Sequence, residues 1–262
     1  EQLCYEINTG RPLAYEGETG ICNLLQAFAD EHGWTIEAEA GLPIALHRDG
    51  DAITLEPGGQ VEFASAPVTT PGALAVRHQR FLNELYAIAE KQGIGVLARG
   101  MPYNWRREDM PLMPKSRYRI MHDYLGTKGN LGRDMMLCSA GIQASLDFSS
   151  ERDMVAKMRL GIALQPLITA LYANSAGTGG ADTGYASYRA HLWEDTDPDR
   201  CGIPDVIFED DMGFSSYIDY MLDVPMFGVV RDGVMHDLSG HSFRDLMAGK
   251  LLDTDGHAYE AS

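Results

Sequence analysis

The sequence is poor in positive charge, and it has no long hydrophobic run free of charged residues. Its 262 residues include 21 Lys and Arg against 38 Asp and Glu, which gives a formal net charge of −17. Nucleic-acid and anionic-membrane surfaces need clustered Lys and Arg, so we expect no nucleic acid and no membrane as partners. The most apolar stretch, residues 154–173, contains Lys157, Arg159 and Pro166. We therefore expect no segment that could span a bilayer.

Cysteine is also scarce, and the four cysteines lie far apart at Cys4, Cys22, Cys138 and Cys201. The absence of a CxxC pair and of a secretory segment argues against a zinc knuckle and a disulfide scaffold. We predict a reducing, cytoplasmic location and no regulatory disulfide. The histidines have no HxxxH or HExxH spacing, and no GxSxG segment occurs, which disfavours zinc enzymes and serine hydrolases.

What the chain does have is ordinary apolar content, 45% of its residues, and enough length to bury a substantial core. The 3.6-residue period predicts helices over residues 21–32, 73–91, 117–125, 151–173, 214–222 and 242–248. The two-residue period predicts strands within residues 34–38, 43–46, 53–63, 94–100, 135–149, 185–193 and 224–233. We predict one α+β domain over residues 1–262.

Acidic side chains gather on one face of the strand-like segment ITLEPGGQVEF, residues 53–63. Alternation places Thr54, Glu56, Gln60 and Glu62 on one face, opposite a row of apolar side chains. The Pro-Gly-Gly in the middle suits a tight turn, so a solvated surface hairpin is one interpretation. The other is a cradle of oxygen ligands for magnesium.

A second segment, residues 135–149, repeats this alternation and places Gln143 and Asp147 on its polar side. If the two strands are neighbours, their polar faces form one floor suited to a metal–nucleotide complex. We also expect Arg189, in SYRAHLW, to lie on a strand. There it would either clamp a phosphate or carboxylate through paired hydrogen bonds or extend along the surface.

Several longer segments together resemble one family, the plant and proteobacterial type of glutamate–cysteine ligase. In chain order they are ITLEPGGQVE, WRREDMPLMPKSRYRIM, DMML, IQASLDFSSERDM, ALQPLITALYANS, YRAHLWEDTDPDR, YIDYMLDVPM and SFRDLMAGKL. The resemblance implies a glutamine-synthetase-like fold, in which a curved antiparallel sheet with flanking helices forms a funnel for ATP, magnesium and glutamate.

The activity that this resemblance implies is the first step of glutathione biosynthesis. The γ-carboxylate of L-glutamate would be joined to the amine of L-cysteine through a γ-glutamyl phosphate, with ATP as co-substrate and Mg²⁺ as cofactor, in a monomer or homodimer. Two alternatives stay open: another acceptor amine, and a non-catalytic fragment that binds Mg-ATP.

The resemblance also implies roles for individual residues. The family opens this region with a Gly-x-Glu-His-Glu strand, and Glu1 matches its second glutamate. The expected magnesium ligands are Glu1, Glu56, Glu62 and Gln143. Nucleotide contacts are expected from Gln143, Asp147, Lys115 and Arg117. Glutamate is expected to bind Arg189, the predicted catalytic residue, together with Trp193 and Arg107. Because the chain begins without methionine and stops soon after FRDLMAGKLL, we expect a catalytic core truncated at both ends.

Overall fold

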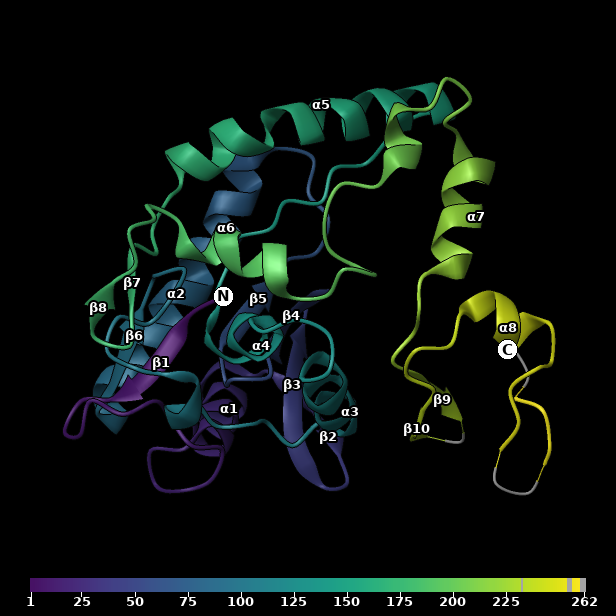
Figure 1. Cartoon of the computed structure of the whole chain (residues 1–262). Coiled ribbons are helices and arrows are strands. Elements are labelled where there is room, and N and C mark those ends of the chain that lie inside the picture. Colours follow the sequence, from purple (N-terminus) through teal and green to yellow (C-terminus); the bar gives the residue numbers. More distant parts are fainter. Residues whose placement is uncertain (232, 254–255, 260–262) are drawn as a thin grey trace. The chain divides into compact units, whose positions relative to one another are not determined.

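The computed structural model describes residues 1–231, 233–253 and 256–259, and it divides into two compact units (Figure 1). Unit 1 comprises Glu1–Arg119, Arg133–Ile142 and Ala173–Arg189. Unit 2 comprises Ile120–Gly132, Gln143–Tyr172 and Ala190–Ser262. The single domain over residues 1–262 stays a prediction.

Antiparallel strands form the centre of unit 1. Four of them pair in the order β2 (Thr35–Glu39), β3 (Leu42–Arg48), β4 (Asp51–Leu55) and β5 (Val61–Ala64). Two more, β1 (Leu3–Glu6) and β6 (Ile94–Leu97), pair with each other. A bridge between Gln2 and Val61 joins the β1–β6 pair to β5. The predicted α+β class is confirmed, and the curved funnel stays a prediction.

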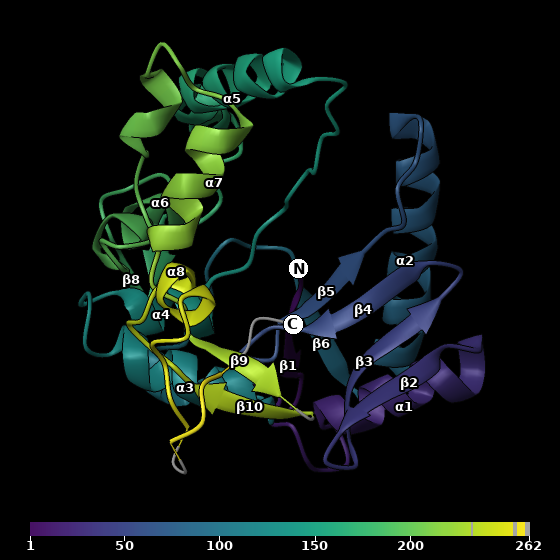
Figure 2. The ribbon, with the colours of Figure 1, turned by 90° about the vertical axis from the view of Figure 1, so that its right-hand side faces the viewer.

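The helices α1 (Ile21–His32) and α2 (Pro71–Gln92) pack beside the four-stranded sheet (Figure 2). Phe81 of α2 stacks on Phe28 of α1 and on Phe63 of β5, with ring centroids 6.2 and 4.8 Å away. Each helix ends at a glycine with positive φ, 71° at Gly33 and 67° at Gly93, which an L side chain would strain. These glycines made both helix ends predictable from the sequence.

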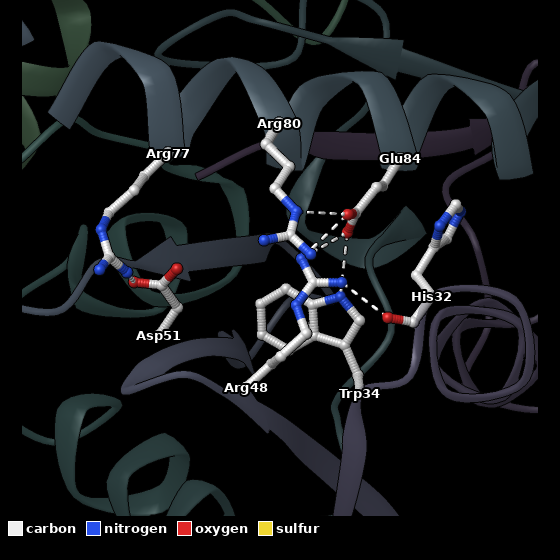
Figure 3. Close-up of polar contacts among 7 residues, drawn as sticks. All are labelled: His32, Trp34, Arg48, Asp51, Arg77, Arg80 and Glu84. Atoms are coloured by element: carbon white, nitrogen blue, oxygen red, sulfur yellow. Dashed lines mark hydrogen bonds and ion pairs between the residues drawn. The ribbon is translucent and has the colours of Figure 1, made fainter. Parts of the chain in front are cut away.

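A buried ion cluster fastens α2 to the sheet (Figure 3). The Glu84 carboxylate accepts hydrogen bonds from Trp34 Nε1 at 3.0 Å, from Arg48 Nη2 at 2.9 Å and from Arg80 Nε at 3.1 Å. The Arg48 guanidinium also stacks over the Trp34 ring, 4.2 Å from its centroid. Burial alone would raise the pKa of Glu84, but these hydrogen bonds outweigh burial and hold the pKa below its ordinary value.

Shorter elements complete the two units. Unit 1 also contains η1 (Arg107–Asp109), β7 (Gly177–Thr178) and β8 (Ala181–Asp182). Three helices have residues in both units: α3 (Ser116–Leu125), α4 (Gly132–Cys138) and α6 (Tyr188–Leu192). The other elements of unit 2 are α5 (Glu151–Leu171), η2 (Trp193–Asp195), η3 (Asp205–Phe208), α7 (Phe214–Asp223), β9 (Gly228–Arg231), β10 (Val234–Asp237) and α8 (Phe243–Met247). The helices predicted at 117–125, 151–173, 214–222 and 242–248 are thereby confirmed within about two residues.

The predicted strand over residues 135–149 is wrong. Residues up to Cys138 belong to α4, and residues 139–150 form neither helix nor strand. Of the side chains that alternation assigned to a buried face, Met136, Cys138 and Ala140 are buried, but Ile142 and Leu146 are 94% and 77% exposed. Alternation can stabilise a strand only where a partner strand is available, and residues 139–150 pair with no strand.

The predicted strand around Arg189 is also wrong, because residues 188–192 form the short helix α6. The start of α6 is fixed by Ser175, whose carbonyl oxygen accepts from the Tyr188 N–H at 3.0 Å. The Ser175 hydroxyl accepts from the Arg189 N–H at 3.1 Å. Such a cap stabilises the first turn of a helix, and here it comes from a residue distant in sequence.

The expectation about membrane-spanning segments is wrong as well. Helix α5 is long and apolar enough to cross a membrane by length and composition alone, a test that the core helix of a soluble protein can also pass. Its start was predicted correctly, since the Ser150 hydroxyl caps it by accepting from the Asp153 N–H at 3.2 Å.

All four cysteines are free thiols, two of them buried and two partly exposed. Burial raises the pKa of Cys4 and of Cys138 to about 12, which suppresses thiolate formation. The pKa of Cys201 is also raised, first by burial and then by the Asp197 charge. The lack of a regulatory disulfide stays a prediction.

Candidate active site

The turn between β4 and β5 is buried, so the interpretation as a solvated hairpin is wrong. Residues 57–60 are all buried. The Met113 N–H donates to the Pro57 carbonyl oxygen at 2.9 Å. A Cβ on Gly58 would lie 2.0 Å from the carbonyl oxygen of Leu137, so only glycine fits against this backbone. The turn therefore sits beneath other parts of unit 1.

Gln60 supports the fold of this region. Its side chain is 1% exposed, and its Nε2 donates to the carbonyl oxygens of Leu137 at 3.3 Å and Ser139 at 2.6 Å. These bonds fasten the end of α4 to the turn. The Nε2 atom is therefore committed to the backbone at the end of α4, while the placement of Gln60 among magnesium-facing oxygens stays a prediction.

Strand register places Glu1 and Glu62 side by side. Glu62 on β5 lies opposite Thr54 on β4, and its Oε2 accepts from the Thr54 hydroxyl at 2.9 Å. Gln2 pairs antiparallel with Val61 through two backbone hydrogen bonds of 2.9 Å. One residue further along each strand, Glu1 and Glu62 are therefore the next opposed pair.

Both of these carboxylates raise the pKa of Glu56. Burial, followed by the charges of Glu62 and Glu1, raises its pKa to about 7. Lys115 and Arg117 lower the same pKa but do not cancel the increase. The three carboxylates thus form one electrostatic group, in which Glu62 and Glu1 oppose the ionisation of Glu56.

The two cations lie at the start of α3, next to this group. Lys115 Nζ donates to the carbonyl oxygen of Leu55, the last residue of β4, at 3.0 Å. Burial and then the neighbouring Arg117 lower the pKa of Lys115, whereas Glu56, Glu37 and Glu39 act in the opposite direction. Charge of both signs is therefore concentrated at this end of β4.

Gly141 brings Arg189 close to Glu1. The Gly141 N–H donates to Glu1 Oε2 at 2.6 Å. A Cβ on Gly141 would lie 2.6 Å from Arg189 Nη2, so the guanidinium passes directly over the glycine. Gly141 could not be singled out from the sequence, because a lone glycine in an apparent strand does not indicate which side chain lies over it.

Four predicted site residues remain. Arg107, on η1, pairs with Asp134 of α4 at 2.9 Å. Three belong to unit 2: Gln143 and Asp147 are exposed on the irregular segment, and Trp193, on η2, is 39% exposed. Residues 139–150 are not a strand, so the second of the two strands that we predicted to share a polar floor does not form.

The donor set of Glu1, Glu56 and Glu62 fits magnesium in its chemistry. No group of three or more His, Cys, Asp or Glu among the described residues is already arranged to hold a metal ion. The three glutamates nevertheless supply only oxygen ligands, which magnesium prefers. Their mutual repulsion, visible in the raised pKa of Glu56, is what a bound cation would offset.

Comparison with known proteins places the chain in a family. A family model described as glutamate-cysteine ligase family 2 matches residues 1–251. The chloroplastic glutamate–cysteine ligase of Brassica juncea is 45% identical over 251 residues, covering 96% of this chain and 48% of the relative. The Nicotiana tabacum enzyme of the same name is 44% identical over 256 residues, 98% of this chain and 48% of the relative.

The chain therefore belongs to glutamate-cysteine ligase family 2, and the predicted resemblance is confirmed. It spans about half the length of these curated relatives. Their names describe them as chloroplastic. This finding contradicts our prediction of a cytoplasmic location, which rested only on the absence of a secretory segment and of paired cysteines.

The raised pKa of Glu56 predicts a stability that depends on pH in metal-free protein. Its pKa is about 7 in the folded state against an ordinary 4.5, so ionisation costs the folded state free energy above pH 7 and nothing below pH 4.5. With a chelator present, Glu56→Gln should raise the free energy of unfolding at pH 8 by on the order of 2 kcal/mol, after allowance for partial exposure.

Urea denaturation between pH 4.5 and pH 8 measures this difference. The gain should shrink steadily as the pH falls. Glu90→Gln, an exposed position on α2, serves as the matched control and should show no such trend. A gain of equal size at both ends of the range would contradict the assigned environment of Glu56.

Proposed function

We propose that the complete protein joins the γ-carboxylate of glutamate to the amine of cysteine at the expense of ATP. The observation that carries this proposal is the grouping of Glu1, Glu56 and Glu62 beside Lys115 and Arg117 in a member of this ligase family. Negative oxygens for a metal and fixed cations for phosphates are the two requirements of phosphoryl transfer.

The reaction has two steps. The γ-carboxylate of glutamate attacks the terminal phosphorus of ATP, which gives γ-glutamyl phosphate and ADP. The neutral amine of cysteine then attacks the acyl carbon, phosphate leaves, and the nitrogen loses a proton to give γ-glutamylcysteine. Bound magnesium, held by Glu1, Glu56 and Glu62, would supply positive charge against the triphosphate.

The chain's own residues bind and orient the substrates. Lys115 and Arg117 contact the phosphate oxygens from the start of α3. Arg189 binds a carboxylate of glutamate through paired hydrogen bonds, a geometry suited to guanidinium. Its passage over Gly141 sets it beside Glu1. The contributions of the remaining residues implied by the resemblance stay predictions: Arg107, Gln143, Asp147 and Trp193.

The acceptor amine is the part of this proposal that the residues constrain least, because no side chain at the site marks a pocket for a thiol. Incubation of the complete protein with ATP, magnesium, glutamate and a panel of amines, followed by mass spectrometry, should yield γ-glutamylcysteine as the main product. Omission of glutamate should abolish ADP formation. Clear preference for another amine, such as 2-aminobutyrate, would retain the chemistry and reject cysteine as the acceptor.

A further inference from the structure

Tyr118 lies at the centre of the contacts that hold Lys115 and Arg117 beside Glu56. Its side chain is 1% exposed, and its hydroxyl donates to the carbonyl oxygen of Leu55 at 2.5 Å. Leu55 ends β4 and directly precedes Glu56. The hydroxyl therefore fastens the start of α3 to the strand end that carries the carboxylate.

The same hydroxyl accepts a hydrogen bond from each of the two cations. Lys115 Nζ lies 3.4 Å and Arg117 Nη2 lies 3.2 Å from the Tyr118 oxygen. A phenolic hydroxyl has one hydrogen to donate and lone pairs with which to accept. Its hydrogen goes to Leu55 and its lone pairs accept from the two cations, so its hydrogen-bonding capacity is used in full.

The ring of Tyr118 adds a second restraint on the cations. The Lys115 nitrogen lies 5.3 Å and the Arg117 guanidinium carbon 5.0 Å from the ring centroid. Positive charge at this distance from an aromatic face is attracted to it. Two like charges so close to each other repel, and both would move toward water without such contacts.

We propose that Tyr118 is a positioning residue, which fixes Lys115 and Arg117 in the arrangement that receives the phosphate groups of a nucleotide next to Glu56. The identity of this ligand rests on the proposed function. Tyr118 itself is buried, so its effect is exerted through the two cations. Its role depends on the carbonyl oxygen of Leu55, which lies far away along the chain.

Tyr118→Phe tests this role, because it removes the hydroxyl and keeps the ring. In the complete protein we expect the KM for Mg-ATP to rise about tenfold, the effect of losing one hydrogen bond to a charged group. The KM for glutamate should change by less than about twofold. Tyr15→Phe is the matched control, because Tyr15 is also buried in unit 1 and its hydroxyl donates to the Pro43 carbonyl oxygen at 2.8 Å.

A second readout needs no turnover. Acylation of Lys115 by an N-hydroxysuccinimide ester, followed by peptide mass spectrometry, should be several-fold faster in Tyr118→Phe than in wild type, because the amine has lost a partner. Tyr15→Phe should leave this rate unchanged. If the acylation rate rises while wild type neither binds nor uses Mg-ATP, the positioning of Lys115 stands and the ligase proposal fails.

Two results would overturn the positioning role. One is an unchanged KM for Mg-ATP together with an unchanged acylation rate at Lys115 in Tyr118→Phe. The other is an equal loss in Tyr118→Phe and Tyr15→Phe, since a general weakening of unit 1 would then explain both.

Discussion

Replacement of Glu56 by glutamine should reduce the ADP formation that depends on glutamate and cysteine by at least about a hundredfold. The substitution keeps the size of the side chain and removes the charge from the centre of the carboxylate group. Glu1 and Glu62 flank this position, as their effect on the pKa of Glu56 shows. Two remaining carboxylates would bind magnesium far more weakly than three, and the triphosphate would lose its counter-charge.

The same variant should be at least as stable as wild type in the absence of metal at pH 8, so loss of activity cannot be ascribed to unfolding. Activity is measured as coupled ADP release at saturating ATP and across a magnesium titration. Glu90→Gln provides the control, since it removes an exposed glutamate from α2 in the same unit. Activity of Glu56→Gln within a few-fold of wild type would exclude Glu56 as a magnesium ligand.

The acidic face was predictable from the sequence because it depends on local alternation. Thr54 and Glu62, assigned to one face by their spacing, are directly opposed in the β4–β5 register. The turn at residues 57–59, with Gly59 at φ 84°, leaves this assignment intact because a hairpin brings the same face of both strands together.

The rest of the site depends on contacts between distant segments. The helical state of residues 188–192 is set by Ser175, and the position of Arg189 by Gly141. The hydroxyl of Tyr118 acts through a carbonyl oxygen at the end of β4. None of these contacts leaves a periodic pattern in the sequence, so reasoning from spacing could not find them. Resemblance to a family implied site roles for Arg189 and Lys115, but it did not show which contacts fix the positions of their side chains.

The largest effect on stability is expected from Glu84, which anchors α2 to the sheet (Figure 3). Glu84→Ala should lower the free energy of unfolding by about 3 to 5 kcal/mol, because it leaves the Arg48 guanidinium buried without its carboxylate. The two side chains are only 10% and 12% exposed and lie 2.9 Å apart. Trp34 Nε1 would lose its acceptor at the same time. Urea denaturation followed by tryptophan fluorescence measures the loss, and Glu90→Ala on the exposed side of α2 should cost less than about 1 kcal/mol.

The charge of Glu84 can be separated from its packing by pH and by a double variant. Because its pKa is held below the ordinary 4.5, the stabilisation by the charge is present above pH 4.5 and is lost as the pH falls through the folded-state pKa. The difference between wild type and Glu84→Gln should therefore shrink in acid. Adding Arg48→Met to Glu84→Gln should recover part of the loss, since an unpaired buried charge is removed. Losses that simply add in the double variant would mean that the two side chains act independently and that the pair does not anchor α2.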